Sequence, residues 1–347
     1  MIICHIAPFA PNRCGLYEAA RDMARADIVG GNEVIFVDAG ITINGERQEP
    51  VIGQVDDRAG FKIVSVNPDM ISEADVIIMH TGCSDNWIVK NQAPLIWAVH
   101  GRPLACFRPE IQGKMNSYSL YKHVAEWKRT KKMLYFWPEF KNDWSVFVPE
   151  NKNLCLDYPV VDSNRFSPQG QSHILSEKGK YNLLVCDSER EDIGLYELVV
   201  GCIEACKKIK CLKIHFFGFD FPLPQCWDIL LGKLKEVGGL GELQGRVTNM
   251  ELVYRAMDGL ISPNRIITRT IAEAISCHVP VITEYGCKVS NYWCNMALSN
   301  DVATTIQCFI DDLEAGANRK DIEEKAKLFS MKSYSKKMNE IYKEVLK

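Results

Sequence analysis

Glu273 and several hydroxyl and basic side chains gather in one segment of the chain, residues 245–283, which reads GRVTNMELVYRAMDGLISPNRIITRTIAEAISCHVPVIT. Its pattern predicts a helix, a buried strand ending at Ser262 and Pro263, a polar loop, a helix containing Glu273, and a second buried strand. In α/β proteins such a strand–loop–helix connection binds phosphates, because backbone N–H groups and the positive end of the helix dipole point there. An acid just inside the helix can accept hydrogen bonds from sugar hydroxyls. The segment therefore predicts a nucleotide-sugar site.

Two histidines follow apolar runs that are typical of buried strands. His100 comes after LIWAV and before a glycine, and His80 comes after VIIM and before a Thr-Gly pair. Ligands of α/β proteins bind at the carboxyl ends of parallel strands, so both histidines are candidates for the same cleft. His5 and His215 fall inside strand patterns, as hydrogen-bonded core residues do. We expect His100 to be the functional histidine, with His80 as its competitor.

The composition is that of a folded protein with two domains. The chain has 347 residues, of which 47% are apolar and 24% charged, and single cores rarely grow beyond about 250–300 residues. The formal net charge of −3 gives no general attraction to nucleic acid or to an anionic membrane. The basic stretch 122–132 is read as a solvated helix face or as a contact surface for a phosphate-bearing acceptor.

The cysteines and the first residues indicate a cytoplasmic protein. The chain contains 14 cysteines, which are scattered, often within apolar runs, and never spaced as CxxC. Reduced core thiols fit this pattern better than a disulfide framework. The opening MIICHIAPFAP has neither the basic start nor the small-residue cleavage site of a signal peptide, and no apolar run reaches the ~20 residues of a membrane span.

Alternating strand and helix patterns predict an α/β fold with parallel sheets. A turn-rich segment, 163–172, separates two such series, and we expect the domain boundary there. The first domain would be 1–162 and the second 163–333, while an amphipathic helix at 334–347 would pack back on the first. The predicted strands are Ile2–Ile6, Glu33–Val37, Val76–Met79, Leu95–Val99, Met133–Phe136, Leu183–Cys186, Lys213–Phe217, Gly259–Ser262 and Val279–Thr283.

Four stretches resemble motifs of a known enzyme family. They are IAPFAPNRCGLYEAARDMA (6–24), WAVHGRP (97–103), DYPVVDSNRFSP (157–168) and the segment 245–283. In this order they resemble the retaining nucleotide-sugar glycosyltransferases of the GT-B fold, specifically glycosyltransferase family 4. The resemblance implies two Rossmann-like domains that face a central cleft, with the acceptor bound by the first domain and the donor by the second.

The resemblance gives roles to individual residues. Glu273 matches the second acid of the family's Glu-x7-Glu motif, which binds the ribose of the donor, and His100 matches a histidine near the reacting sugar. Arg265 stands where the family has its first acid, so recognition of the donor sugar must differ here, because a guanidinium donates hydrogen bonds and cannot accept them. Gly15 matches one of two loop glycines that let the backbone approach a ligand. His278 replaces the glycine that usually follows the motif A-x-x-C.

The donor's diphosphate would need cationic partners. The family's Arg and Lys lie in a loop for which this chain has CDSEREDIG, and there only Arg190 is available. We therefore expect Arg190, Arg265 and Arg269 to share the cationic role. The backbone amides of Thr268, Arg269 and Thr270, at the start of the helix, would supply the remaining hydrogen bonds.

The expected activity is transfer of a sugar from a UDP- or GDP-sugar to an acceptor hydroxyl with retention of configuration. No DxD-type acidic cluster stands at a strand end, so we expect metal-independent phosphate binding and no permanently bound cofactor. The acceptor stays open between a small molecule, a lipid-linked sugar and modified nucleic acid, and the sequence leaves the oligomeric state open.

Two rival functions use the same scaffold. One is a non-catalytic or degenerate GT-B module that binds a nucleotide sugar without turnover, which Arg265 and the poor CDSEREDIG loop favour. The other is a GT-B epimerase or phosphorylase. Neither cellular nor viral origin can be read from the residues.

Overall fold

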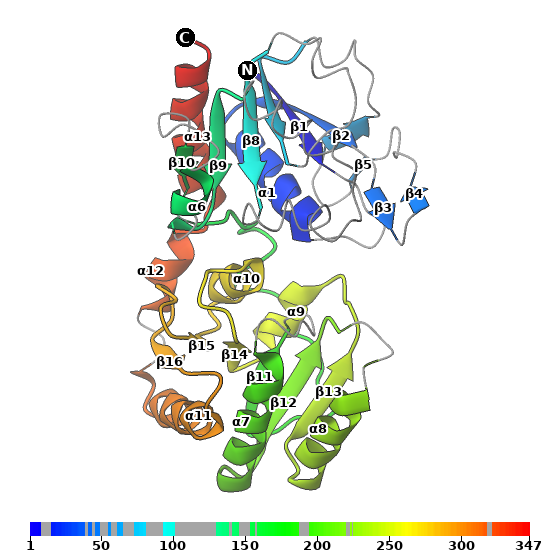
Figure 1. Ribbon diagram of the computed structural model, residues 1–347, viewed down its shortest axis with the longest axis vertical. Helices are drawn as coiled ribbons and strands as arrows, with labels where there is room; N and C mark the ends of the chain where they lie inside the picture. Colours follow the sequence, from blue (N-terminus) through cyan, green and yellow to red (C-terminus); the bar gives the residue numbers. More distant parts are fainter. Residues whose placement is uncertain are drawn as a thin grey trace. The chain divides into compact units, whose positions relative to one another are not determined.

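The computed structural model divides into an N-terminal unit, Met1–Asp162 with Ser330–Lys347, and a C-terminal unit, Ser163–Phe329 (Figure 1). Val161 and Ser330, which adjoin the two places where the chain passes between the units, form a parallel β-bridge. Each unit contains its own sheet. The structure describes residues 1–7, 15–38, 41–43, 46–48, 55–56, 61–64, 73–80, 93–100, 130–138, 141–145, 153–156, 158–186, 194–219, 223, 225–317 and 321–347.

The N-terminal unit is built on an eight-stranded sheet with the order β10-β9-β8-β7-β1-β2-β6-β5. Neighbouring strands pair in parallel except β5 and β6, which are antiparallel. The central strands β1, β7 and β8 are apolar and buried along almost their whole length, as strands covered on both faces are. Their bounds are β1 Ile2–Ala7, β2 Glu33–Asp38, β5 Val55–Asp56, β6 Phe61–Val64, β7 Val76–Met79, β8 Leu95–Val99, β9 Lys132–Tyr135 and β10 Asn153–Cys155; β3 (Ile41–Ile43) and β4 (Glu46–Gln48) form a separate antiparallel pair.

Two helices from opposite ends of the chain cover one face of this sheet. Met23 of α1 (Gly15–Val29) and Met338 of α13 (Met331–Val345) share a buried cluster with strand residues such as Ile78. Figure 1 shows the red helix α13 beside the sheet of the N-terminal unit. The short helix α6 (Lys141–Ser145) also belongs to this unit. Helix α13 therefore completes the N-terminal core.

The C-terminal unit is built on a six-stranded parallel sheet with the order β13-β12-β11-β14-β15-β16. Residues of α7, α8 and α11 form one large core cluster with this sheet. Helix α10 packs against α9 and α12 and also contacts β14 and β15. The bounds are β11 Tyr181–Val185, α7 Leu195–Lys208, β12 Leu212–Phe217, α8 Gln225–Glu236, β13 Leu240–Gln244, α9 Met250–Arg255, β14 Gly259–Ser262, α10 Arg269–Ser276, β15 Val281–Glu284, β16 Tyr292–Cys294, α11 Ser299–Glu314 and α12 Ile322–Lys327.

The predicted α/β class with parallel sheets is confirmed. Strands β7, β8 and β14 have the predicted bounds, and the other predicted strands differ by one or two residues at one or both ends. The sequence pattern does not predict β13 or β16, which are the two edges of the second sheet. Edge strands keep half-buried or polar positions, so their apolar pattern is weak. Helix α13 begins at Met331 rather than Tyr334, because the Ser330 side chain caps it by accepting a hydrogen bond from the Ser333 N–H at 3.3 Å.

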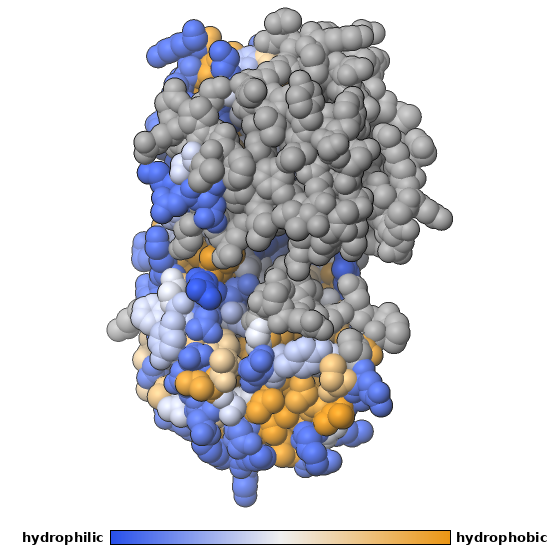
Figure 2. Space-filling model, viewed as in Figure 1, coloured by the Kyte–Doolittle hydropathy of each residue, from blue (hydrophilic) through white to orange (hydrophobic). Residues whose placement is uncertain are grey.

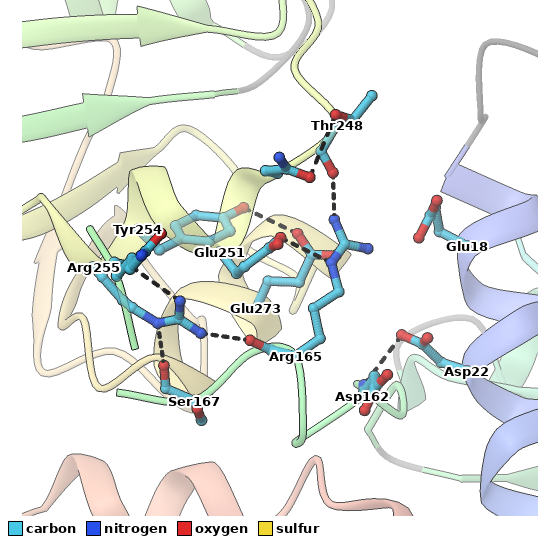
Figure 3. Close-up of polar contacts among 12 residues, drawn as sticks. Glu18, Asp22, Asp162, Arg165, Ser167, Thr248, Glu251, Tyr254, Arg255 and Glu273 are labelled. Atoms are coloured by element: carbon cyan, nitrogen blue, oxygen red, sulfur yellow. Dashed lines mark hydrogen bonds and ion pairs between the residues drawn. The ribbon is translucent and has the colours of Figure 1, made fainter. Parts of the chain in front are cut away.

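Arg255, the last residue of α9, holds the turn-rich segment 163–172 against the C-terminal unit. Its guanidinium donates to the carbonyls of Ser167 at 2.8 Å, Gln171 at 3.1 Å and Arg165 at 2.7 Å. Arg165 in turn donates to the Glu251 carboxylate on the same helix at 2.8 Å (Figure 3). The segment is thus fixed to the helix that leads into β14.

The surface of the C-terminal unit mixes polar and apolar side chains. Figure 2 shows an orange apolar area over α7 and α8, where Val200 and Ile229 are among the exposed large apolar residues. No helix in the described part of the chain is long and apolar enough to cross a membrane. The cysteines in the described ranges form no disulfide.

Candidate functional site

The connection from β14 to α10 contains most of the predicted donor-site residues. Strand β14 is buried between β11 and β15 and ends at Ser262, after which Pro263 cannot donate to the ladder. Six residues, 263–268, then lead to the first residue of α10, Arg269. The sheet and helix therefore have the predicted strand–loop–helix form, and the loop lies at the carboxyl end of the strand.

Thr268 is the N-cap of α10. Its backbone is extended (φ −71°, ψ 168°), and its side-chain oxygen accepts from the N–H of Ile271 at 3.4 Å. The hydroxyls of Thr268 and Thr270 lie 2.8 Å apart. The N–H groups of Arg269 and Thr270 are in the first turn, where the helix itself offers no acceptor. This end of α10 can therefore direct N–H donors and the helix dipole at an anion.

Glu273 lies one turn inside α10 and is 7% exposed. One carboxylate oxygen, Oε1, is 2.7 Å from Nε of Arg269, and the other, Oε2, accepts from the Tyr254 hydroxyl at 3.1 Å. In Figure 3 the ring of Tyr254, from α9, points at Glu273. Burial, and then the neighbouring Cys186 and Glu273, raise the pKa of Tyr254 well above its usual value, so the phenol keeps its proton and donates.

Two protein groups hold the Glu273 carboxylate. Arg269 contacts Oε1 and the Tyr254 hydroxyl donates to Oε2, and a carboxylate oxygen can accept two hydrogen bonds. Arg269 is the counter-ion of this acid, and its side chain is 16% exposed. A diphosphate at the start of α10 would therefore share Arg269 with Glu273. Tyr254 has no signal in the sequence, because only the packing of α9 against α10 brings it to the acid.

Arg265 is exposed in the loop between β14 and α10, eight residues before Glu273. Nearby, the Asn264 amide donates to the Ser262 hydroxyl at 3.1 Å. The loop thus has a cation at the position of the family's first acid. Arg190 lies outside the described residues.

His278 lies directly after the C-cap of α10, where the sequence resemblance described above leads to a glycine. Its φ is +60°, in the left-handed region that ends many helices, and its N–H donates to the Ile275 carbonyl at 2.9 Å. Glycine has no steric cost in this conformation, whereas histidine is strained there. The usual glycine is therefore the residue that this helix end favours.

The two candidate histidines of the N-terminal unit are hydrogen-bonded to each other. Nδ1 of His80 is 3.0 Å from Nε2 of His100, and Nε2 of His80 is 3.0 Å from Nδ1 of His5. His5 and His80 are buried and His100 is half-buried. Burial, and then the neighbouring His100 and His5, lower the pKa of His80 well below its usual value. The two sequence candidates are thus parts of one row rather than alternatives.

The remaining sequence candidates differ in how the structure places them. His215 is a buried core residue, 3.2 Å from the Asn182 side-chain oxygen, as its strand pattern predicts. Gly15 begins α1, and a Cβ there would meet no atom within 4 Å among the described residues. Two tryptophans of the same unit as Gly15, Trp97 and Trp144, are buried against each other with ring centroids 6.2 Å apart, and therefore belong to the core. Most of the basic stretch 122–132 lies outside the described ranges.

No metal site is found in the described part of the chain, where no three His, Cys, Asp or Glu side chains are grouped to hold an ion. The N–H donors and cations at the start of α10 are the anion-binding groups that the described residues offer.

Solved structures share this architecture over their whole length. A glycosyltransferase from Rickettsia africae has a TM-score of 0.66 at 15% identity, covering 100% of this chain and 98% of its own. HepE from Anabaena in complex with UDP and glucose has a TM-score of 0.69 at 12% identity, with 98% of both chains covered. The chain has the GT-B glycosyltransferase fold. An alpha-glucosyltransferase in complex with UDP and a DNA 13-mer containing an HMU base has a TM-score of 0.69 at 11% identity over 100% of both chains.

No protein-family model and no curated protein sequence matches the chain. At identities of 11–15%, these structural matches establish the GT-B fold, and the function has to be argued from the residues of the site.

Proposed function

We propose that the protein is a glycosyltransferase that moves a sugar from a nucleoside-diphosphate sugar to an acceptor hydroxyl. The observation that carries the proposal is the start of α10, where N–H donors, Arg269 and the buried acid Glu273 follow the buried strand β14. One end of this site suits a diphosphate and the other suits the hydroxyls of a ribose. The GT-B fold of the chain agrees with it.

Glycosyl transfer requires the site to stabilise a leaving diphosphate. The first-turn N–H groups of α10 and the guanidinium of Arg269 would contribute donors, and the exposed Arg265 could contact a phosphate or a carboxylate on the sugar. Glu273, held by Tyr254, would fix the ribose. This arrangement supports metal-independent transfer. Retention of configuration and a UDP- or GDP-sugar donor are the forms of the activity that we propose.

For the acceptor we propose chemical classes rather than one compound. His100 lies at the carboxyl end of β8 in the N-terminal unit, which suits a contact with the reacting sugar or the acceptor. A small molecule, a lipid-linked sugar and modified nucleic acid are the classes to compare. One structure with the same fold is described as bound to DNA that contains an HMU base.

A binding module without turnover is the second candidate, and two observations favour it. Arg265 replaces an acid, and Arg269 is already paired with Glu273 at 2.7 Å.

Measuring turnover separates the candidate functions. The purified chain is incubated with UDP- and GDP-sugars and each acceptor class, and released nucleoside diphosphate and product are measured. Product with one donor supports transfer, an epimerised sugar or a sugar phosphate supports an epimerase or phosphorylase, and binding without product supports the module. The absence of any nucleotide binding would refute all of them.

Calorimetry with UDP and inorganic pyrophosphate tests the residues. Glu273→Gln should weaken UDP binding about 10-fold or more, as the loss of a hydrogen bond to a charged group does. It should not weaken pyrophosphate binding, because Arg269 then loses a competing carboxylate. Arg269→Ala should weaken both ligands. Lys233→Ala is the matched control, because Lys233 lies on the surface of α8 and forms an ion pair with Glu236 at 2.7 Å. Equal affinities in all variants would refute the assignment.

A further inference from the structure

A continuous row of hydrogen bonds runs from α13 through the N-terminal sheet to the end of β8. The Tyr342 hydroxyl donates to Oδ2 of Asp27 at 2.7 Å, and the same oxygen is 2.8 Å from Nε2 of His5. His5, His80 and His100 then follow with ring-nitrogen distances of 3.0 Å at both steps. The ring planes are inclined by 19° and 28°, with centroids 5.3 Å apart at both steps, so the rings follow one another edge to edge.

The register of the strands explains why the histidines meet. His5 of β1 lies level with Ile78 of β7, and His80 follows Ile78 by two residues. Met79 is paired with Trp97 of β8, so His80 is level with the next residue of that strand, Ala98. His100 lies two residues after Ala98. Steps of two keep all three side chains on one face of the sheet.

Only one end of the row approaches solvent. Asp27 and His5 are 0% exposed and His80 is 2% exposed, whereas His100 is half-buried. Helix α1 contributes Asp27, and α13 contributes Tyr342 and the buried Tyr334, the pKa of which is raised by burial and by Asp27. The flanking rings described around the row are Phe36 beside His5 and Phe136 beside His100. Among the described residues, the Asp27 carboxylate is thus the acidic group that contacts the row, and it lies at the buried end.

When all three rings are neutral, the carboxylate fixes the tautomer of each one. Asp27 accepts, so Nε2 of His5 carries a proton and Nδ1 of His5 is an acceptor. His80 must then donate from Nε2 and accept at Nδ1, and His100 must donate from Nε2. Nδ1 of neutral His100 is therefore the acceptor nitrogen at the outer end of the row.

We propose that this row is a proton relay that stores, beside Asp27, a proton taken up at His100. A proton binds Nδ1 of His100; the Nε2 proton of His100 passes to Nδ1 of His80, and the Nε2 proton of His80 passes to Nδ1 of His5. His100 and His80 end neutral in the opposite tautomer, and His5 ends as an imidazolium paired with the Asp27 carboxylate. Asp27, His5 and His80 are positioning residues for His100.

The energetics favour the buried end for the charge. An imidazolium in the middle of the row would have no counter-ion, and burial already disfavours a charged His80. At His5 the charge lies 2.8 Å from a carboxylate oxygen, where low dielectric strengthens the attraction. On the proposed function, on which this last step alone rests, the relay would receive the proton that the acceptor hydroxyl loses when it bonds to the sugar.

Histidine-labelled NMR of the full chain tests the relay without turnover. Long-range nitrogen–carbon spectra report the tautomer and the protonation of each ring. At a pH above the uptake midpoint, wild-type His100 should be the Nε2–H tautomer, and below it His100 should become Nδ1–H while His5 becomes an imidazolium. A Nδ1–H tautomer above the midpoint would overturn the proposal whatever the variants do. His215, buried in the other unit, is the internal control whose signals should not move.

Two variants separate a relay from a set of satisfied core groups. Asp27→Asn removes the counter-charge and should lower the pH midpoint at which His100 takes up a proton, seen in the wild type as its change of tautomer, by about one unit or more. His80→Gln keeps one donor and one acceptor in the row but cannot pass a proton. It should preserve the His100 tautomer and lower the midpoint similarly. An unchanged midpoint in His80→Gln would overturn the relay, also if Asp27→Asn fails to fold.

The two proposals fail in different ways. A chain that shows the relay but neither binds nor transfers nucleotide sugars would refute the proposed function alone. A transferase whose His100 titrates identically in wild type and His80→Gln would refute the relay alone.

Discussion

Replacing Arg255 by alanine is the sharpest test of how the C-terminal unit is held together. The guanidinium donates to three main-chain carbonyls, at 2.7, 2.8 and 3.1 Å, and so ties segment 163–172 to α9. Hydrogen bonds from charged groups contribute about 1.5–3 kcal/mol each. The segment is largely exposed, so its carbonyls regain water when the side chain is removed. We therefore take about 1 kcal/mol per contact and expect a total loss of about 3 kcal/mol.

Hydrogen exchange in increasing urea measures this loss locally. The His173 N–H donates to the Leu252 carbonyl at 2.9 Å, so its exchange reports release of the segment from α9. Arg255→Ala should speed this exchange by about 100-fold, which corresponds to about 3 kcal/mol. Arg255→Lys should lose most of the same stability, because one ammonium cannot reach carbonyls spread like those of a planar fork. Lys233→Ala should change it by less than about 0.5 kcal/mol.

A double-mutant cycle with Gly170 identifies the contact responsible. Gly170 has φ +121°, and a Cβ there would lie 2.8 Å from Nη1 of Arg255. Gly170→Ala should therefore cost more in the wild type than in Arg255→Ala, where only the backbone strain of about 1–3 kcal/mol remains. Strictly additive effects, or unchanged exchange at His173 in Arg255→Ala, would refute the view that Arg255 anchors the segment.

Three further predictions concern single sites. Burial lowers the pKa of His215 to about 4 from an unfolded value near 6.5, so the folded state binds this proton less readily than the unfolded state does. The contribution of neutral His215 to stability is therefore present above pH 6.5 and is lost as the pH falls towards 4. In His215→Asn the urea midpoint of unfolding should fall less steeply over that pH range. Gly201→Ala should destabilise the protein by about 1–3 kcal/mol, because the new Cβ would lie 2.4 Å from Cβ of Val302. Gly232→Ala, where a Cβ would meet nothing within 4 Å, should instead stabilise α8 by up to about 1 kcal/mol. Thermal unfolding of the two variants measures both effects. His278→Gly should raise the melting temperature, since it relieves a φ of +60° worth about 1 kcal/mol, and a lower one would contradict the strain.

The amino-acid sequence by itself determines the central strands and the β14–α10 connection. Strands β7, β8 and β14 are buried on both faces, so each is a short continuous apolar run with clear ends. The edge strands β13 and β16 lack that pattern because their burial depends on neighbours distant in the chain. The position of Glu273 after the polar loop could likewise be read from the order of apolar and polar residues.

Tertiary structure alone decides the partners of the functional groups. Tyr254 reaches Glu273 only because α9 packs against α10. His80 and His100, which the sequence presents as competitors, are joined because parallel register places them two residues apart on adjacent strands of one face. Asp27 meets the row through the packing of α1 on the sheet. Periodicity reports which face of an element is buried, whereas a hydrogen bond between residues far apart in the chain depends on how the elements are brought together.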